Sequence, residues 1–200
     1  MDEIVKQAMA KWPNVPHCYG WLALDARGNW RMRDERAQKL NLAGDRINNQ
    51  ALLGFINRNY VHDDQGRWYF QNGPQRVYIN IEATPFIART DPSRGFVLHT
   101  GEALEFVDAA WITESGLLLL KSGDRIAQVD DRDMSHCLMR LHINGVPAED
   151  DRLLAWLDEP ADDACLTFEY AGKHVQVERL ERDNIPAKFG FIRHPQPDAA

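Results

Sequence analysis

Short apolar runs separated by glycine-containing turns occur throughout this chain of 200 residues. They restrict it to folds built from short strands, because apolar runs of about four to eight residues bounded by turn signals are typical of strands. Over residues 95–130 such runs follow one another closely, and this spacing predicts an antiparallel meander. The longest run, residues 116–120, is far shorter than the roughly 18 residues of a membrane-spanning helix, so we expect no membrane span.

Helical patterns alternate with these strands, which predicts an α+β fold of mainly antiparallel sheets with a few covering helices. An apolar stripe that includes Ile47, Leu53 and Ile56 predicts a helix over residues 46–59, with Asp45 as its N-cap. The other expected elements are a helix before Pro13, a hairpin over residues 19–34, strands at residues 68–70 and 76–82, a helix over residues 148–157 ended by Pro160, and a hairpin over residues 165–180.

An internal repeat is the second organising feature of the sequence. Residues 44–56 align without a gap on residues 145–157, matching the opening glycine and a Leu-Leu pair, and the hairpin that follows each segment aligns as well. The pattern predicts a duplicated hairpin-helix-hairpin unit, with a first α+β repeat over residues 1–92 and a second over residues 93–196. We expect residues 197–200 to be a disordered tail.

Charge and cysteine content indicate which partners the protein is not expected to bind and in which cellular compartment it is expected. The formal net charge of -7 and a pI near 5.5 oppose binding to a phosphate backbone or an anionic lipid surface, so we expect neither nucleic acid nor a membrane as partner. The N-terminus lacks the basic and apolar regions of a secretion signal. The odd number of cysteines, Cys18, Cys137 and Cys165, indicates reduced packing residues in a cytoplasmic protein.

Residues 67–89, which contain Pro74, the alternating segment 77–82 and the run 83–87, carry a family resemblance. This stretch resembles the bacterial family called domain of unknown function 1285, or a sister family. The resemblance implies a duplicated α+β arrangement and a regulatory or signalling role. It implies no catalytic residues, so none can be carried over to this chain.

A row of polar residues on one expected strand is the most suggestive candidate site. Tyr78, Asn80, Glu82 and Thr84 alternate with apolar residues, so they are expected to project from the strand face opposite Val77, Ile79 and Ile81. Arginines at the two ends of the row would attract a carboxylate or phosphate. The predicted ligand-binding residues are Arg76, Tyr78, Asn80, Glu82, Thr84 and Arg89.

Three other groups of residues are weaker candidates for a functional site than this polar row. Two His-Cys pairs offer zinc ligand types but without the spacing of known zinc motifs, and clustered aspartates lack the spacing of a calcium loop, so we expect no metal site. A thiolate with a histidine base is a conceivable nucleophile, but nothing in the sequence marks such a pair. The residues concerned are His17 with Cys18, His136 with Cys137, Asp130, Asp131 and Asp133 with residues 149–151, and Cys137 or Cys165 with His142 or His174.

The absence of a nucleotide-binding loop or nucleophile motif favours a non-enzymatic protein that binds a small anionic ligand or a protein partner, with a regulatory or signalling role. A hydrolase or transferase that uses Cys or His is the first alternative. The second is an assembly protein, homo-oligomers included, because six tryptophans exceed the needs of a small core. No cofactor follows from the sequence.

Overall fold

The computed structural model describes residues 1–159 and 164–198, which fold into two compact units. The first unit comprises Met1–Pro85 and Phe189–Ala200, and the second comprises Phe86–Lys188. Each unit contains a sheet dominated by antiparallel pairs, with helices, so the predicted α+β class is confirmed. Within the described ranges, no helix is long and apolar enough to cross a membrane.

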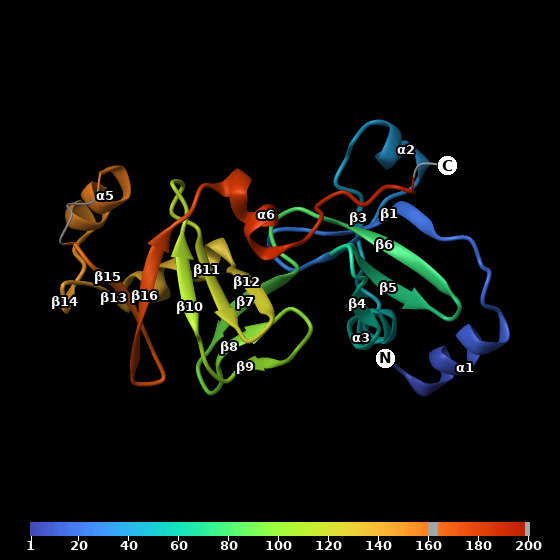
Figure 1. Cartoon of the computed structure of the whole chain (residues 1–200), viewed down its shortest axis with the longest axis horizontal. Helices are drawn as coiled ribbons and strands as arrows, with labels where there is room; N and C mark the ends of the chain where they lie inside the picture. Colours follow the sequence, from blue (N-terminus) through green and yellow to red (C-terminus); the bar gives the residue numbers. More distant parts are fainter. Residues whose placement is uncertain (160–163, 199–200) are drawn as a thin grey trace. The chain divides into compact units, whose positions relative to one another are not determined.

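The described part of the first unit forms a six-stranded sheet in the order β3-β2-β1-β6-β5-β4 (Figure 1). Neighbouring strands are antiparallel except for the parallel pair β1 and β6. Helix α3 covers one face, where the rings of Phe55 and Phe70 lie 5.4 Å apart. The elements are α1 (Glu3–Lys11), β1 (Cys18–Leu24), β2 (Trp30–Met32), α2 (Glu35–Lys39), β3 (Asp45–Arg46), α3 (Gln50–Arg58), β4 (Tyr60–His62), β5 (Trp68–Asn72) and β6 (Gln75–Ile81).

The start of α3 differs from the sequence-based expectation. Asn49 is the N-cap, because its side chain accepts a hydrogen bond from the backbone N of Leu52 at 3.0 Å. Asp45, the predicted cap, instead belongs to strand β3, and the backbone N of Ile47 donates to the carbonyl of Trp30 at 2.9 Å. The helix therefore begins at Gln50, since the first apolar residue of the predicted stripe is used by the sheet.

The second unit has ten described strands in the order β14-β13-β15-β16-β10-β11-β12-β7-β8-β9. The pairs β10–β16 and β12–β7 are parallel, and the other pairs are antiparallel. The elements are β7 (Phe86–Asp91), β8 (Gly95–Leu98), β9 (Ala103–Leu104), β10 (Ala109–Ile112), β11 (Leu118–Ser122), β12 (Arg125–Val129), η1 (Asp131–Asp133), α4 (Met134–Leu138), β13 (Leu141–Ile143), β14 (Val146–Pro147), α5 (Asp150–Asp158), β15 (Leu166–Tyr170), β16 (Lys173–Arg179), η2 (Arg182–Asn184) and α6 (Ile185–Phe189).

The strands predicted over residues 95–130 are present, but they do not form one continuous meander. Strands β7, β8 and β9 form one antiparallel group, and β10, β11 and β12 form another. The two groups meet through the parallel pair β12–β7, so β9 stays at the sheet edge and β10 pairs with β16. The predicted stop of the following helix at Pro160 and residues 199–200 of the expected tail lie outside the described residues.

The two units share a strand order over part of their sheets. The series β3-β2-β1-β6-β5-β4 of the first unit corresponds to β12-β11-β10-β16-β15-β13 of the second, with one parallel pair at the same place in each series. Helix α3 then takes the place of η1 and α4, whereas the sequence alignment paired it with α5. The duplication itself stays a prediction.

Candidate functional site

The face of the first sheet opposite α3 carries Tyr78 and Asn80 and is called the polar face. An irregularity in strand β1 shapes this face. Cys18 pairs with Val77 and Leu22 pairs with Ile79, so residues 19–21 all stand opposite Tyr78. Gly20 makes this possible, since its φ of +79° is unfavourable for other residues and an added Cβ would lie 2.7 Å from Gln38 Oε1. The extra residues allow Tyr19 to stack flat on Tyr78, with ring centroids 4.6 Å apart.

Arg33, directly after strand β2, is a buried cation with no carboxylate partner among the described residues. Only 7% of the residue is exposed. Its Nε donates to the carbonyl of Leu42 at 3.0 Å, and its Nη2 donates to Asn41 Oδ1 at 3.2 Å and to the carbonyl of Ala37 at 3.5 Å. These neutral acceptors hold the guanidinium in place without cancelling its charge.

Arg33 lines a cavity of about 350 Å³ on the polar face of the sheet. An adjoining hollow shares four of its residues, Arg33, Asn41, Asn80 and His194, and extends to Tyr19 and Gln38. The volume lies in the range of small-molecule sites, roughly 300–1,000 Å³. The residues around the cavity are Ala23, Leu24, Asp25, Arg31, Arg33, Asn41, Leu42, Ala43, Asn80, Glu82, Arg193 and His194.

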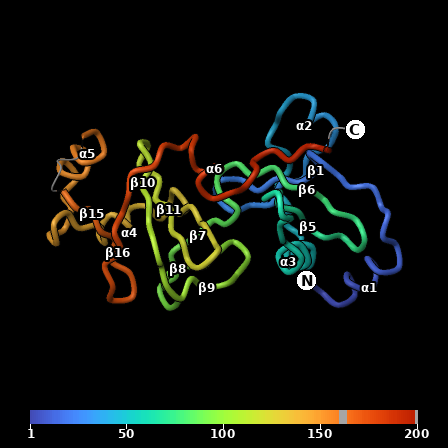
Figure 2. Tube along the Cα trace, viewed as in Figure 1, coloured from blue at the N-terminus to red at the C-terminus, as the bar shows by residue number. Residues whose placement is uncertain are grey.

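One wall of the cavity comes from the C-terminal segment, residues 189–198, which runs beside strand β6 (Figure 2). The backbone N of Ile81 donates to the carbonyl of Arg193 at 2.8 Å, and the N of Ile192 donates to the carbonyl of Gly66 at 3.0 Å. The contact is close enough that a Cβ on Gly66 would lie 2.0 Å from the carbonyl oxygen of Gly190. Arg193 and His194 reach the cavity because these bonds hold the segment against the end of β6 and the turn before β5.

The charged groups of the cavity fall into paired and unpaired sets. Arg31 Nε lies 2.8 Å from Asp25 Oδ2, so these two charges largely cancel each other. Asp25 is further occupied by Asn29. Glu82 accepts a hydrogen bond from the backbone N of Ala26 at 3.0 Å, and no cation among the described residues pairs with it. The cavity therefore holds one positive charge, on Arg33, and one negative charge, on Glu82, that are not paired by an opposite charge among the described residues.

A cluster of aromatic and charged residues surrounds Tyr78 farther along the same face. The hydroxyl of Tyr78 donates to Asp63 Oδ2 at 3.1 Å, and the guanidinium of Arg67 lies 5.0 Å from the Tyr78 ring centroid. Partial burial would raise the pKa of Asp63, but hydrogen bonds from Arg67 and Tyr78 lower it below its usual value. Burial together with the charges of Arg76 and Arg67 lowers the pKa of His17, which favours the neutral form of this ring.

The predicted polar row is only partly assembled. Asn80 and Glu82 line the cavity, but Tyr78 is 1% exposed beneath Tyr19. Arg76 lies beside Tyr78, with its Nη1 3.5 Å from the hydroxyl. Thr84 is buried beyond the end of β6, and Arg89 belongs to the second unit, where its Nε lies 3.1 Å from Asp130 Oδ2. The row ends early because the hydrogen bonding between β1 and β6 reaches no farther than Glu82, so Thr84 lies outside the paired strand.

The sequence did not reveal the residues that dominate the cavity, which are Arg33, Asn41, Arg193 and His194. No periodic pattern marks Arg33 as buried, since its partners come from the loop after α2. The end of the chain is not expected to return to the first unit from any local signal. The predicted hairpin over residues 19–34 does contribute to the cavity, through Asp25 in its turn and Arg31 in its second strand.

The thiols do not form a comparable site. Cys137 has no exposed surface, and burial raises its pKa to about 12, so it stays a protonated thiol at neutral pH. Cys165 is exposed and Cys18 is half-buried. Across the described ranges, no group of three or more His, Cys, Asp or Glu side chains is arranged to hold a metal ion.

A second hollow, of about 310 Å³, lies on the opposite, α3-covered face of the first sheet. Its walls are apolar apart from Asn72 and the thiol of Cys18, and Trp21, Met32 and Leu52 are partly exposed around it. It offers burial but almost no polar group to orient a ligand. The cavity around Arg33 therefore has more polar groups that could recognise and orient a ligand than this apolar hollow.

Comparison with known proteins gives a family and a similar structure. The model of family DUF2944, described as "Protein of unknown function (DUF2946)", matches residues 1–196. The crystal structure of a DUF1285 family protein from Silicibacter pomeroyi DSS-3 is similar over 88% of this chain and 94% of that one, with 14% sequence identity and a TM-score of 0.49. None of the curated proteins matches this sequence.

Proposed function

The chain belongs to the DUF2944 family of proteins of unknown function, and we propose that it is a non-enzymatic protein that binds a small anionic molecule in the cavity around Arg33. A regulatory or signalling role is part of the same proposal, with the bound molecule as the signal. The observation that carries the proposal is the buried Arg33 guanidinium, which lines a cavity and has no carboxylate partner among the described residues.

Burial of this cation has an energetic cost that its contacts only partly offset. Moving a charge out of water costs several kcal/mol even after relaxation, and neutral carbonyl and amide acceptors return less than a carboxylate does. Within the described part of the chain, Nη1 of Arg33 has no hydrogen-bond acceptor, so two N–H groups are available to a ligand. A ligand carboxylate or phosphate would supply both acceptors and the missing negative charge.

The residues around the cavity favour binding over catalysis. They include no Ser, Thr, Cys, Lys or Tyr. The possible nucleophiles are Asp25, Glu82 and His194, and of these Asp25 is already held by Arg31 and Asn29. The cavity instead presents guanidinium and amide donors held by backbone contacts, which suits recognition of a fixed shape. Cys137, one nucleophile considered from the sequence, is excluded from such a role by its burial and raised pKa.

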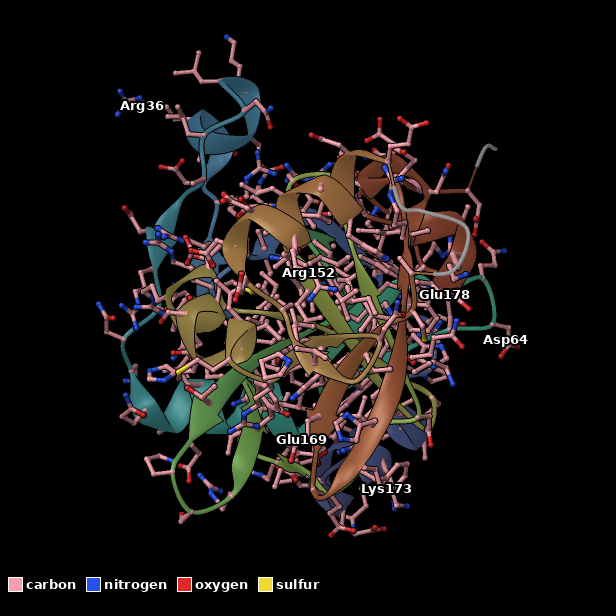
Figure 3. The ribbon with its side chains drawn as sticks, turned by 90° about the vertical axis from the view of Figure 1, so that its left-hand side faces the viewer. Arg36, Asp64, Arg152, Glu169, Lys173 and Glu178 are labelled. Atoms are coloured by element: carbon pink, nitrogen blue, oxygen red, sulfur yellow. The ribbon has the colours of Figure 1, made fainter. Side chains whose placement is uncertain are left out.

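The test is calorimetric titration of the full chain with a panel of carboxylate and phosphate metabolites, followed by the Arg33→Gln variant on each hit. Loss of the charge-assisted hydrogen bonds, about 1.5–3 kcal/mol, should weaken binding about tenfold to a hundredfold. Arg152→Gln is the matched control, because Arg152 is an exposed residue of α5 in the second unit (Figure 3). A folded Arg33→Gln variant that binds as tightly as the unsubstituted protein would refute the proposal.

Hydrogen exchange on the unsubstituted protein gives a test that does not depend on folding of the variant. The ligand should protect backbone amides of residues 30–33 and 192–194, which flank the cavity. Protection confined to other segments would place the site elsewhere. Mass spectrometry of the ligand after prolonged incubation should recover it unchanged, and turnover would overturn the non-enzymatic assignment.

A further inference from the structure

Two opposite charges line the same cavity without meeting each other. Arg33 is held by Leu42, Asn41 and Ala37, and Glu82 is held by the backbone N of Ala26. No ion pair joins Arg33 to Glu82, so their charged atoms are more than 4.0 Å apart. Each is anchored by a different loop, which prevents the pair from collapsing onto itself.

We infer that the ligand is zwitterionic and belongs to the amino-acid class, with its carboxylate on Arg33 and its ammonium group on Glu82. The inference rests on the proposed function and specifies the chemistry of the same cavity. An anion alone would satisfy Arg33 but would leave the Glu82 carboxylate facing a like charge. A ligand with both charges matches both walls, and electrostatic complementarity of this kind sets specificity.

The remaining polar groups of the cavity support this assignment. Asp25 cannot take the place of Glu82, because Arg31 and Asn29 already occupy its two oxygens. The Glu82 carboxylate is oriented by its bond to Ala26, a residue 56 positions away in the sequence. The Asn80 side chain also lines the cavity and can both donate and accept, so it suits a group that carries an amine beside a carboxylate.

The position of Glu82 is itself a product of the fold. Its backbone N donates to the carbonyl of Leu24 at 3.0 Å, which extends the pairing of β1 with β6 by one residue. In the second unit Leu180 makes the same bond to Ile112. A leucine at that place supplies no carboxylate, so we expect one zwitterion site per chain, in the first unit.

The experiment is calorimetry of the full chain against the proteinogenic amino acids and the ω-amino acids β-alanine, 4-aminobutanoate and 5-aminopentanoate. Each amino acid that binds is compared with its deaminated acid, which keeps the carboxylate and loses the ammonium group. The amino acid should bind about tenfold to a hundredfold more tightly, the equivalent of one charge-assisted hydrogen bond. The stoichiometry should be one ligand per chain.

The Glu82→Gln variant tests the contact with the ammonium group separately from the contact with the carboxylate. It keeps the size of the side chain and should lower affinity for the amino acid about tenfold or more, while affinity for the deaminated acid stays the same or rises. Glu169→Gln is the matched control, since Glu169 is an exposed residue of β15 (Figure 3). Because Glu82 is itself exposed, the substitution is not expected to impair folding.

The outcomes are distinguishable. If deaminated acids bind as tightly as amino acids and Glu82→Gln changes nothing, the zwitterion inference is wrong and the anion site stands. If amino acids lose affinity in Arg33→Gln but not in Glu82→Gln, the ammonium group is bound elsewhere and the inference is again overturned. If neither amino acids nor carboxylates bind, both the inference and the proposed function fail.

Discussion

The close contact between Gly66 and Gly190 gives a substitution whose effect can be worked out from the structure. In Gly66→Ala, the new Cβ would lie 2.0 Å from the Gly190 carbonyl oxygen, whereas real contacts are hardly ever shorter than 3.0 Å. The C-terminal segment must therefore retreat by about 1 Å, which would break both the 3.0 Å bond from Ile192 to Gly66 and the 2.8 Å bond from Ile81 to Arg193. With a net value of about 1 kcal/mol each, the loss is about 2 kcal/mol.

Gly116→Ala provides the control for backbone strain. Gly66 and Gly116 have φ of +76° and +80° and occupy the same place in two similar turns, which begin at Asp63 and Thr113. A left-handed alanine costs roughly 1–2 kcal/mol in both. A Cβ on Gly116 meets nothing within 4 Å, so the control lacks only the collision.

The assay is native-state hydrogen exchange of the Ile81 and Ile192 amides, read by NMR. The loss of about 2 kcal/mol corresponds to roughly 30-fold faster exchange of these two amides in Gly66→Ala, since 1.4 kcal/mol is a factor of ten. Gly116→Ala should leave their exchange unchanged. Equal acceleration in both variants, or none in Gly66→Ala, would refute the description of the C-terminal segment as a closely packed part of the first unit.

Asp130→Asn should destabilise the second unit by about 2–3 kcal/mol at neutral pH, because the buried carboxylate accepts charge-assisted bonds from Arg132 and Arg89. Burial would raise the pKa of Asp130, but the bonds from Arg132 lower it below the usual value. The contribution of this carboxylate to stability is therefore present above about pH 4 and fades as the pH falls towards about 2. Urea unfolding in which the substitution costs the same free energy at both pH values would contradict the reasoning. At neutral pH, iodoacetamide should modify the exposed Cys165 well before Cys137, whose pKa is about 12, and mass spectrometry showing early modification of Cys137 in the folded protein would disprove its burial.

The strands could be predicted from the sequence wherever apolar residues alternate regularly with polar ones. Val77, Ile79 and Ile81 alternate because each points into the α3-covered side of the sheet, and the observed strand β6 contains all three. The same alternation was extended too far, to Thr84, because the sequence cannot show where a strand loses its hydrogen-bonding partner. Asn80 and Glu82 of the predicted row do line the cavity, although Glu82 lies one residue beyond β6, and their role in ligand binding stays a prediction.

The centre of the site was not predictable, because its causes are long-range. Arg33 is held by the carbonyl groups of Ala37 in α2 and of Leu42 in the loop after it, whereas an arginine after a strand is usually solvated. The parallel pairing of β1 with β6 joins segments more than 50 residues apart, so no periodicity of either strand indicates it. The predicted start of α3 was wrong for a related reason, because Ile47 fits the residue pattern of a strand and of a helix equally well.

The return of residues 189–198 to the first unit determines when the cavity can exist during synthesis. The ribosome completes residues 1–85 and then the whole second unit before it adds Arg193 and His194. A nascent chain can fold its second unit as one continuous stretch, but the cavity of its first unit lacks a wall until residues 193 and 194 have been added. Chains that stop before Arg193, or that are cleaved before it, would keep most of the first sheet without a complete cavity, so binding at the proposed site would distinguish chains that extend through His194.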